Sequence, residues 1–418
     1  MKKTSIALIG ALVFGFMLNG INLFAQSSDL VASGFTRSRF AFQVDDGSLF
    51  INEQILSSTL EWRADSATAH ADFSLTAEDG RTVKPDLKEL YVDWYGDSFD
   101  LRIGKQKVLW GKSDGVFITD IVSPKDLSAF LTKDIGELRL GVTGIKLYYF
   151  AGSHQLEAVW LPVFTPAILP GKGSLWAVSP SFPVIPTLTP AEIPESSLEN
   201  AEYFGRYSYL GSFFDFQVMG GWMWNDTPIA SITNKTMTPG VGITAITIQP
   251  EYYQVAVAGL AASLPLGPLV LKTEGSFTWN QRYQETMNPQ STGWVEKNDL
   301  QYLFGGDISF VGATLSLQWI QDIVLDHDDT LVRDEILNSM TAILQRSFNR
   351  ETLRAEIFSV VNIKNIETMD AMIKPQLTWI PGNGFQASLG GWFFLGESGQ
   401  FGQYTENNGV YLSTAFYF

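Results

Sequence analysis

The sequence predicts an all-β protein, a transmembrane antiparallel β-barrel of about 18 strands, with 16 as the alternative. Three observations support this fold class. Apolar and polar residues alternate in segments of about ten residues, short connections alternate with long ones, and aromatic residues reach 13% while charged residues make up only 17% of the chain. A barrel strand in a bilayer presents one face to lipid and the other to the lumen, which produces this alternation.

The composition limits the classes of partner and chemistry. A formal net charge of −16 over 418 residues argues against nucleic acid as a partner, because phosphate binding needs a basic surface. The absence of cysteine excludes disulfides, thiolate metal sites and cysteine nucleophiles. Three histidines leave little for a metal centre or for general-base catalysis. We therefore expect no enzyme activity, no cofactor and no resident metal.

The N-terminus has the features of a secretory signal. Lys2 and Lys3 precede an apolar run over 6–18, and the small residue Ala25 follows. We predict a cleaved signal peptide over 1–25 and a barrel domain over 26–418. A membrane anchor is the less favoured alternative, because the run is shorter than the ~20 residues that a spanning helix needs.

Eighteen segments with period-two alternation follow. They lie at 34–44, 52–63, 67–77, 87–95, 98–109, 138–150, 154–163, 200–210, 213–224, 248–263, 268–281, 297–309, 312–323, 338–348, 351–362, 369–380, 384–396 and 408–418. The short connections are rich in Gly, Asn, Asp and Pro, as tight hairpins require. Longer connections lie at 110–137, 164–199, 225–247, 282–296, 324–337 and 397–407. A soluble β-sandwich would also alternate, but the strand number and the aromatic content favour the barrel.

The last segment resembles the assembly signal of outer-membrane barrel proteins. Alternation runs through Phe416 to a terminal Phe418. We expect the barrel assembly machinery to recognise these two residues, with the bacterial outer membrane as the location; the alternative is an ordinary apolar strand end. This orientation places the C-terminus in the periplasm and the long connections outside the cell.

The stretch from Leu101 to Asp114 carries the most distinctive motif. It resembles the signature R-x-G-[RK]-Q-x-x-x-W-G-x-S-D of an outer-membrane family catalogued as a domain of unknown function (DUF1302-like), and the resemblance extends over about 88–210, including 200–206. A similar Gly-Arg-Gln strand occurs in alginate-export-type porins, where Lys105 of this chain replaces the arginine. The resemblance implies handling of lipids or other apolar compounds, with a periplasmic lipoprotein and an RND-type inner-membrane exporter as partners.

Charged and polar residues on the predicted inward faces are candidates for the lumen lining. They are Glu61, Arg63, Asp72, Glu89, Asp93, Asp100, Arg102, Gln106, Arg139, Glu157, Glu202, Arg206, Lys272, Glu274, Arg354, Glu356 and Lys374. Inward charges can select solutes by sign. They can equally pair with one another to fill a narrow lumen, and opposite charges within single strands favour such internal networks.

Two long connections are predicted to affect the lumen. In 110–137, Ser123 as N-cap and Pro124 at the first helical position predict a short amphipathic helix. The connection 164–199 is proline-rich yet apolar, and its candidate constriction residues are Phe164, Ile168, Leu169, Leu175, Trp176, Phe182 and Ile185. We expect it to fold inward and partly occlude the lumen; the alternative is an exposed apolar surface for a ligand.

Two candidate sites remain. Acidic residues with His327 cluster over 322–335, and a solvated loop is favoured over a divalent-cation site because the spacing matches no calcium loop. The pair His70 and Asp72 lies on one inward face without an activated serine. We predict an outer-membrane channel for apolar or amphipathic small molecules or lipids with a loop-gated lumen. The alternatives are a general or charge-selective porin for hydrophilic solutes, a surface adhesin or a barrel hydrolase.

Overall fold

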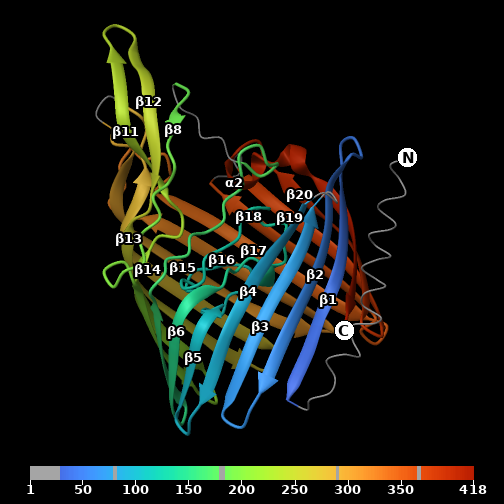
Figure 1. Cartoon of the computed structure of the whole chain (residues 1–418). Helices are drawn as coiled ribbons and strands as arrows, with labels where there is room; N and C mark the ends of the chain where they lie inside the picture. The colour runs from blue at the N-terminus through green and yellow to red at the C-terminus, as the bar shows by residue number, and fades with distance from the viewer. Residues whose placement is uncertain (1–28, 79–81, 178–183, 289–290, 365–368) are drawn as a thin grey trace.

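The computed structural model describes residues 29–78, 82–177, 184–288, 291–364 and 369–418. Within these ranges, eighteen antiparallel strands form one sheet that closes on itself (Figure 1). The strands are β1 (Leu30–Gln43), β2 (Leu49–Arg63), β3 (Ala67–Glu78), β4 (Thr82–Tyr95), β5 (Phe99–Gln106), β6 (Val142–Ala151), β7 (His154–Leu161), β9 (Glu202–Leu210), β10 (Asp215–Trp224), β13 (Gln254–Leu266), β14 (Leu269–Gln284), β15 (Trp294–Phe310), β16 (Ala313–Val324), β17 (Ile336–Phe348), β18 (Leu353–Ile363), β19 (Met369–Gly382), β20 (Phe385–Leu395) and β21 (Gly409–Tyr417). The predicted fold class is confirmed.

The barrel closes where the last strand pairs with the first. β21 lies antiparallel to β1 from Phe35↔Tyr417 to Gln43↔Gly409. Beyond the strand, Phe418 and Gly34 each donate a backbone N–H to the other's carbonyl at 3.0 Å. Gly34 has no room for a side chain here, because a Cβ would overlap the backbone carbonyl oxygen of Ser57 on β2 and would lie 2.9 Å from the Phe418 ring. Phe416 points outward from the same strand. Recognition of the two phenylalanines by the assembly machinery stays a prediction.

The two ends of the barrel differ (Figure 1). Connections of two to four residues, such as 64–66, 96–98 and 152–153, join the strands at one end, which we call the turn side. The long connections gather at the other end, the loop side. This arrangement agrees with the predicted alternation of short and long connections.

A separate small sheet stands on the loop side. β11 (Ile229–Thr238) and β12 (Gly242–Glu251) form a hairpin that extends away from the barrel, and β8 (Thr187–Leu188) pairs with β12 (Figure 1). We call β11 and β12 the outer hairpin. The connection predicted at 225–247 contains β11 and the start of β12, and the prediction of one strand at 248–263 was wrong. The alternation at 248–263 belongs to two strands, which are separated at Tyr252 and Tyr253.

The outward face of the wall is apolar. On β4, the outward residues Leu90 and Val92 are 52% and 51% exposed, and Trp94 is the next outward residue. Asp93, which lies between Val92 and Trp94, is buried. The same alternation continues on β5, where Ile103 is exposed and its neighbour Arg102 turns inward to Asp93. In a soluble protein such a belt would be costly, and in a bilayer it meets lipid.

Helices are short. Those within the described ranges are η1 (Ile135–Glu137), α2 (Gly399–Gly402) and η2 (Thr405–Asn407). In the part of the chain that is described, no helix is long and apolar enough to cross a membrane. The predicted amphipathic helix after Ser123 was wrong. The Ser123 hydroxyl accepts the N–H of Val108 at 2.8 Å instead of capping a helix, and Lys125 pairs with Arg139 in a β-bridge.

Candidate functional site

Residues 107–141, between β5 and β6, cross the interior of the barrel, and we call them the inner loop. Asp114 pairs with Lys272 on β14 at 2.6 Å. On the opposite wall, Glu137 forms two hydrogen bonds with Arg37 on β1, at 2.8 and 3.0 Å. These contacts define the inner face of the wall.

Glu274 on β14 is the main anchor of the inner loop. Its carboxylate accepts backbone N–H groups of Lys112, Ser113 (2.5 Å) and Thr119 (3.2 Å), and the Thr119 hydroxyl at 2.7 Å. The side chain is almost fully buried, at 1% exposure. A buried carboxylate needs such donors, because an unpaired charge in this position would be strongly destabilising.

The sequence signature builds this anchor. Gly111 has φ +88°, and a Cβ there would lie 2.9 Å from the Thr119 hydroxyl and 3.2 Å from the Glu274 carboxylate. Trp110 is buried and donates its indole N–H to Glu157 on β7 at 3.1 Å. The Trp-Gly-x-Ser-Asp part of the motif therefore wraps the chain around Glu274 and turns it into the lumen.

Further ion pairs hold the returning half of the inner loop. Asp120 accepts the N–H of Trp110 at 3.0 Å and the guanidinium of Arg139 at 2.5 Å. Burial would raise the pKa of the Glu137 carboxyl, but the ion pair with Arg37 outweighs it and holds the pKa below its ordinary value. At neutral pH, these ion pairs therefore stabilise the inner loop in its position inside the barrel.

The connection 162–201 divides into an inner and an outer part. Phe164 is buried against Trp224 and Tyr252, and Trp176 is buried in an aromatic cluster with Phe130 of the inner loop and Tyr404. Ile168 pairs with Asp126 in a β-bridge and lines the cavity described below together with Leu175, while Leu169 is partly exposed; Ile185 is 96% exposed, and Phe182 lies outside the described residues. Phe164 and Trp176 are therefore buried and Ile185 is exposed, whereas occlusion of the lumen by this connection stays a prediction.

A cavity of about 690 Å³ lies between the inner loop, the start of 162–201 and the inner face of β1–β5. Its apolar lining residues include Phe50, Leu140 and Trp176. Its charged lining has eight basic and five acidic residues: Arg37, Arg39, Lys84, Lys88, Lys105, Lys107, Lys133 and Arg139 against Glu53, Glu78, Asp86, Asp126 and Glu137. The cavity therefore carries an excess of positive charge in a protein whose net charge is −16.

A second basic group lies on the inner face nearer the turn side. Lys146 on β6 is directly opposite Arg102 on β5 and is only 5% exposed. Arg102 pairs with Asp93 at 2.6 Å, and Arg206 on β9 pairs with Glu157. Among the described residues, Lys146 has no hydrogen-bond acceptor, although its ammonium lies 5.1 Å from the Tyr148 ring. Three cations and two carboxylates meet here, which leaves one positive charge over.

The predicted lumen residues that lie on strands all fall on the inner face, by strand register. Arg139 is the exception in position, because β6 begins only at Val142 and Arg139 belongs to the inner loop. Many of these charges pair internally: Glu61 with Arg63, Asp93 with Arg102, Glu157 with Arg206, and Lys272 with Asp114 and Asp307. Others contact backbone: Glu89 accepts Lys107 N–H, Glu202 accepts Trp224 N–H, Gln106 donates to Gly144 O, and Lys374 donates to Leu131 O and Lys133 O. Asp72 accepts the Ser57 hydroxyl, whereas Asp100, Arg354 and Glu356 lie on the inner face without contact to the inner loop in the described structure.

Sequence reasoning missed several basic residues of the cavity, chiefly Arg37, Arg39, Lys84 and Lys88. In Thr36-Arg37-Ser38-Arg39 both faces of the strand are polar, so alternation does not reveal which one turns inward. Lys88 sits at a bulge where the register between β3 and β4 shifts, which turns it inward beside Glu89. Neither position has a signal in spacing alone.

The other candidate residues form structural contacts. His70 stacks on Tyr91 with 4.7 Å between ring centroids. In the 322–335 segment, Asp322 pairs with Arg333, whose carbonyl lies 2.8 Å from the His327 ring nitrogen. Within the described ranges, no three His, Asp or Glu side chains are arranged to hold a metal ion.

A closed antiparallel wall with an apolar outer belt, a charged interior and long connections at one end defines a bacterial outer-membrane β-barrel. Residues 50–378 match the family described as "Protein of unknown function (DUF1302)", and the chain belongs to this family. No curated protein sequence matches the chain.

Solved structures share the fold at low sequence identity. OccAB1 of Acinetobacter baumannii aligns with a TM-score of 0.55 at 10% identity, covering 94% of this chain and 97% of that chain. OccK3 (OpdO) of Pseudomonas aeruginosa gives 0.54 at 11%, covering 96% and 99%. OccD3 (OpdP) of the same organism gives 0.53 at 8%, covering 94% and 91%. At these identities the similarity is one of fold.

Proposed function

We propose that the protein is an outer-membrane channel for amphipathic anions, with a lumen gated by the inner loop. The observation that carries the proposal is the cavity of about 690 Å³, which is lined by eight basic and five acidic residues together with apolar side chains. A solute with an anionic head and an apolar body would find a partner for each part. Short turns face the periplasm in outer-membrane barrels, so the cavity would open toward the cell exterior.

The cavity can attract an anion because part of its charge is unpaired. Arg37 and Arg39 are engaged with Glu137 and Glu53. Lys88 and Lys107, by contrast, form no ion pair within the described structure. An unpaired ammonium in a partly enclosed site attracts anions more strongly than one in bulk water, because the local dielectric constant is lower.

The group around Lys146 would form the next step of the path. A buried ammonium without an acceptor is destabilising unless an anion or water satisfies it. An anionic head that leaves the cavity toward the turn side would meet Lys146 between Arg102 and Arg206. The path would therefore continue on the wall formed by β5, β6 and β9.

The inner loop would act as the gate. It lies between the cavity and the far wall, and Glu274 fixes its first half through four hydrogen bonds. Release of this anchor would widen the lumen. The aromatic cluster of Phe130, Trp176 and Tyr404 would hold the other side of the gate.

Planar-bilayer recording tests the proposal. We expect anion preference in a KCl gradient and a block of the current by decanoate at lower concentration than by acetate. The double variant Lys88→Met/Lys107→Met should lose most of this preference, whereas Lys364→Met, which removes a lysine paired with Asp334 outside the cavity, should not. Cation preference of the unmodified channel would contradict the proposal.

A porin for small hydrophilic anions is the second candidate, because Ser74, Thr76 and Asn52 also line the cavity. The two blockers separate the candidates. Equal block by decanoate and acetate would favour the hydrophilic porin, and a large, steady conductance in simple salt would remove the gating part of the proposal.

The partner predictions concern other proteins. Deletion of Phe418 tests recognition by the assembly machinery, and accumulation of unfolded chain in the periplasm is expected. Cross-linking from the turn side tests the periplasmic lipoprotein and the RND-type exporter. The signal peptide over 1–25 lies outside the described residues and stays a prediction, which N-terminal sequencing of the mature protein checks.

A further inference from the structure

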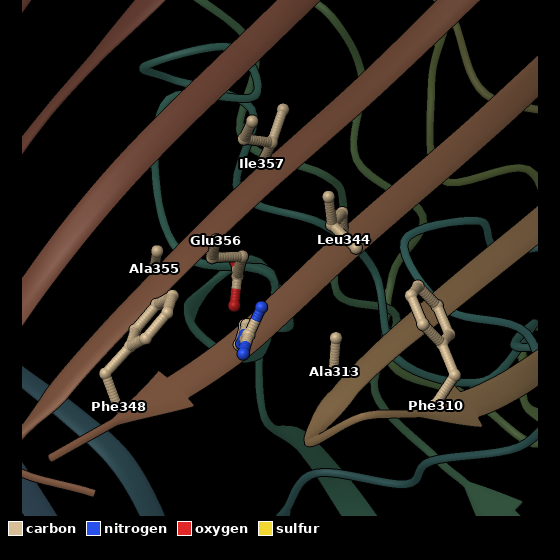
Figure 2. Close-up of a pocket in the computed structure, with 8 residues that line it drawn as sticks. Phe310, Ala313, Leu344, Phe348, Ala355, Glu356 and Ile357 are labelled. Atoms are coloured by element: carbon tan, nitrogen blue, oxygen red, sulfur yellow. The ribbon is translucent and has the colours of Figure 1, made fainter.

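A groove on the outward face of the barrel contains an arginine. Its volume is about 250 Å³, and β15 to β18 form it near the turn side. Figure 2 shows Phe310, Leu344, Phe348 and Ile357 around it. All four are exposed apolar side chains on the face that meets lipid.

The groove results from two small residues beside a large one. In the strand register, Arg346 on β17 lies between Ala313 on β16 and Ala355 on β18. Each alanine leaves space that the phenylalanines and Leu344 border. The Arg346 guanidinium lies 4.9 Å from the centroid of the Phe348 ring, which supports one face of it.

Arg346 has no ion-pair or hydrogen-bond partner in the structure as described. Glu356 lines the floor of the groove, but its register partner is Gln345 on the inner face, and it forms no ion pair with Arg346. An unpaired guanidinium that faces lipid is unfavourable near the middle of the bilayer and tolerated only close to the headgroups.

The height of Arg346 fits the headgroup region. β17 has 13 residues, and a strand of this length tilted by about 40° spans roughly 33 Å, which exceeds the ~25 Å apolar belt by roughly 4 Å at each end. Arg346 lies two residues before the end of β17 at Phe348, so its guanidinium reaches the edge of the belt. The outward Trp379 stands in the same row of the wall as Phe348, through Leu353, and tryptophan favours this interface.

From this geometry we propose that the groove binds one phospholipid of the leaflet on the turn side. The Arg346 guanidinium donates to the phosphate, and an acyl chain lies along Leu344 and Ile357 toward the middle of the membrane. Guanidinium and phosphate match in geometry and charge, which selects a phosphate headgroup over an uncharged one. This site is on the outside of the wall and does not depend on the proposed transport function.

Native mass spectrometry of the folded barrel in non-ionic detergent tests the site. We expect one phosphatidylglycerol to bind to the unmodified barrel. The affinity of Arg346→Ala for this lipid should be lower by about tenfold or more. Arg346→Lys should retain part of the binding. Arg354→Ala is the matched control. Arg354 on β18 pairs with Ser347, the residue that follows Arg346 on β17, but its side chain lies on the inner face of the wall. A heat-modifiable gel shift shows that each variant has folded, and Arg346→Gln replaces Arg346→Ala if the alanine variant does not fold.

Three outcomes would overturn the proposal. Equal binding of phosphatidylglycerol by Arg346→Ala and the unmodified barrel would remove the role of the arginine. Equal binding of diacylglycerol, which lacks the phosphate, would reduce the groove to an acyl-chain contact. A dimer that Arg346→Ala dissociates would make the groove an interface between two copies. Lipid A, which occupies the other leaflet, should bind independently of Arg346.

Discussion

The inner loop and the outer hairpin start from the same end of the barrel, yet one crosses the interior and the other extends away from it. The inner loop satisfies its backbone with side chains of the wall, chiefly the Glu274 carboxylate. The outer hairpin satisfies its backbone by pairing β11 with β12. A long connection enters the lumen when the wall offers partners for its polar groups, and it remains outside when it can pair with itself.

Glu274→Ala should have the largest effect on this difference. It removes the acceptor of four donors, two of them buried and two partly buried, and should lower the free energy of unfolding by about 3–5 kcal/mol. It should also raise the single-channel conductance, because the inner loop loses its anchor. Urea unfolding followed by tryptophan fluorescence and bilayer recording measure the two effects. Glu356→Gln, an inner-face change without inner-loop contact, is the control; unchanged conductance in Glu274→Ala would contradict the anchoring role.

Gly111→Ala should have the next largest effect. The alanine would have to adopt φ +88°, and its Cβ would lie 2.9 Å from the Thr119 hydroxyl. We therefore expect the free energy of unfolding to decrease by about 1–3 kcal/mol. Gly152→Ala provides a comparison, because Gly152 has φ +62° at a short turn with open space around it. Bilayer recording should show a changed conductance for Gly111→Ala and not for Gly152→Ala. An equal change in both variants would mean that backbone strain, and not the contact with Thr119 and Glu274, causes the effect.

A change in pH should alter the contributions of the inner loop and of the outer-hairpin region to stability in opposite directions. Glu137 in the inner loop has a pKa held below its ordinary value, so its contribution is complete above about pH 4.3 and is lost as the pH falls through the lowered pKa. In the short segment between β10 and the outer hairpin, burial raises the pKa of Asp226 to about 7, although the positive charge of Lys125 opposes this increase. There the folded state gains protons, so stability decreases as the pH rises from about 4 to 7.

Unfolding measured against pH in Glu137→Gln and Asp226→Asn separates these contributions. Glu137→Gln should reduce the loss of stability in acid. Asp226→Asn should flatten the decline between pH 4 and 7. A profile that neither variant changes would show that other groups determine the pH dependence.

Shortening the outer hairpin should have the smallest effect. Replacement of 237–244 by an Asn-Gly turn removes the exposed tip of the hairpin beyond the register pair Thr236 and Ala245 and leaves the buried Ile246 in place. We expect a change in unfolding free energy within about 0.5 kcal/mol and an unchanged conductance. A large change in either value would mean that the outer hairpin, too, controls the lumen.

The wall was predictable from the sequence because lipid imposes a repeating local pattern. Each of the eighteen predicted segments overlaps a barrel strand. The outer hairpin also has a local sequence signal, since Pro239-Gly240 is a turn pair between alternating segments. The prediction of one strand at 248–263 conflicts with this hairpin, because β12 ends at Glu251 within that segment.

The candidate site was less predictable because its partners are remote in the chain. Trp110-Gly111-Lys112-Ser113-Asp114 was recognised as a motif, but Glu274 and Lys272 lie about 160 residues later. Ser123-Pro124 has the local features of a helix start, yet the contact of Ser123 with Val108 decided otherwise. Local propensity has little influence where a segment is enclosed on all sides and each polar group must find a partner.

The seam between β1 and β21 has a consequence for biogenesis. Because the first and last strands are neighbours, a chain that lacks residues 409–418 leaves β1 and β20 as the two edges of an open sheet, and their N–H and C=O groups that face β21 lose their partners. Such edges recruit other strands and promote aggregation. Pairing of β1 with β21 removes both open edges, and the hydrogen bonds between Gly34 and Phe418 complete the seam.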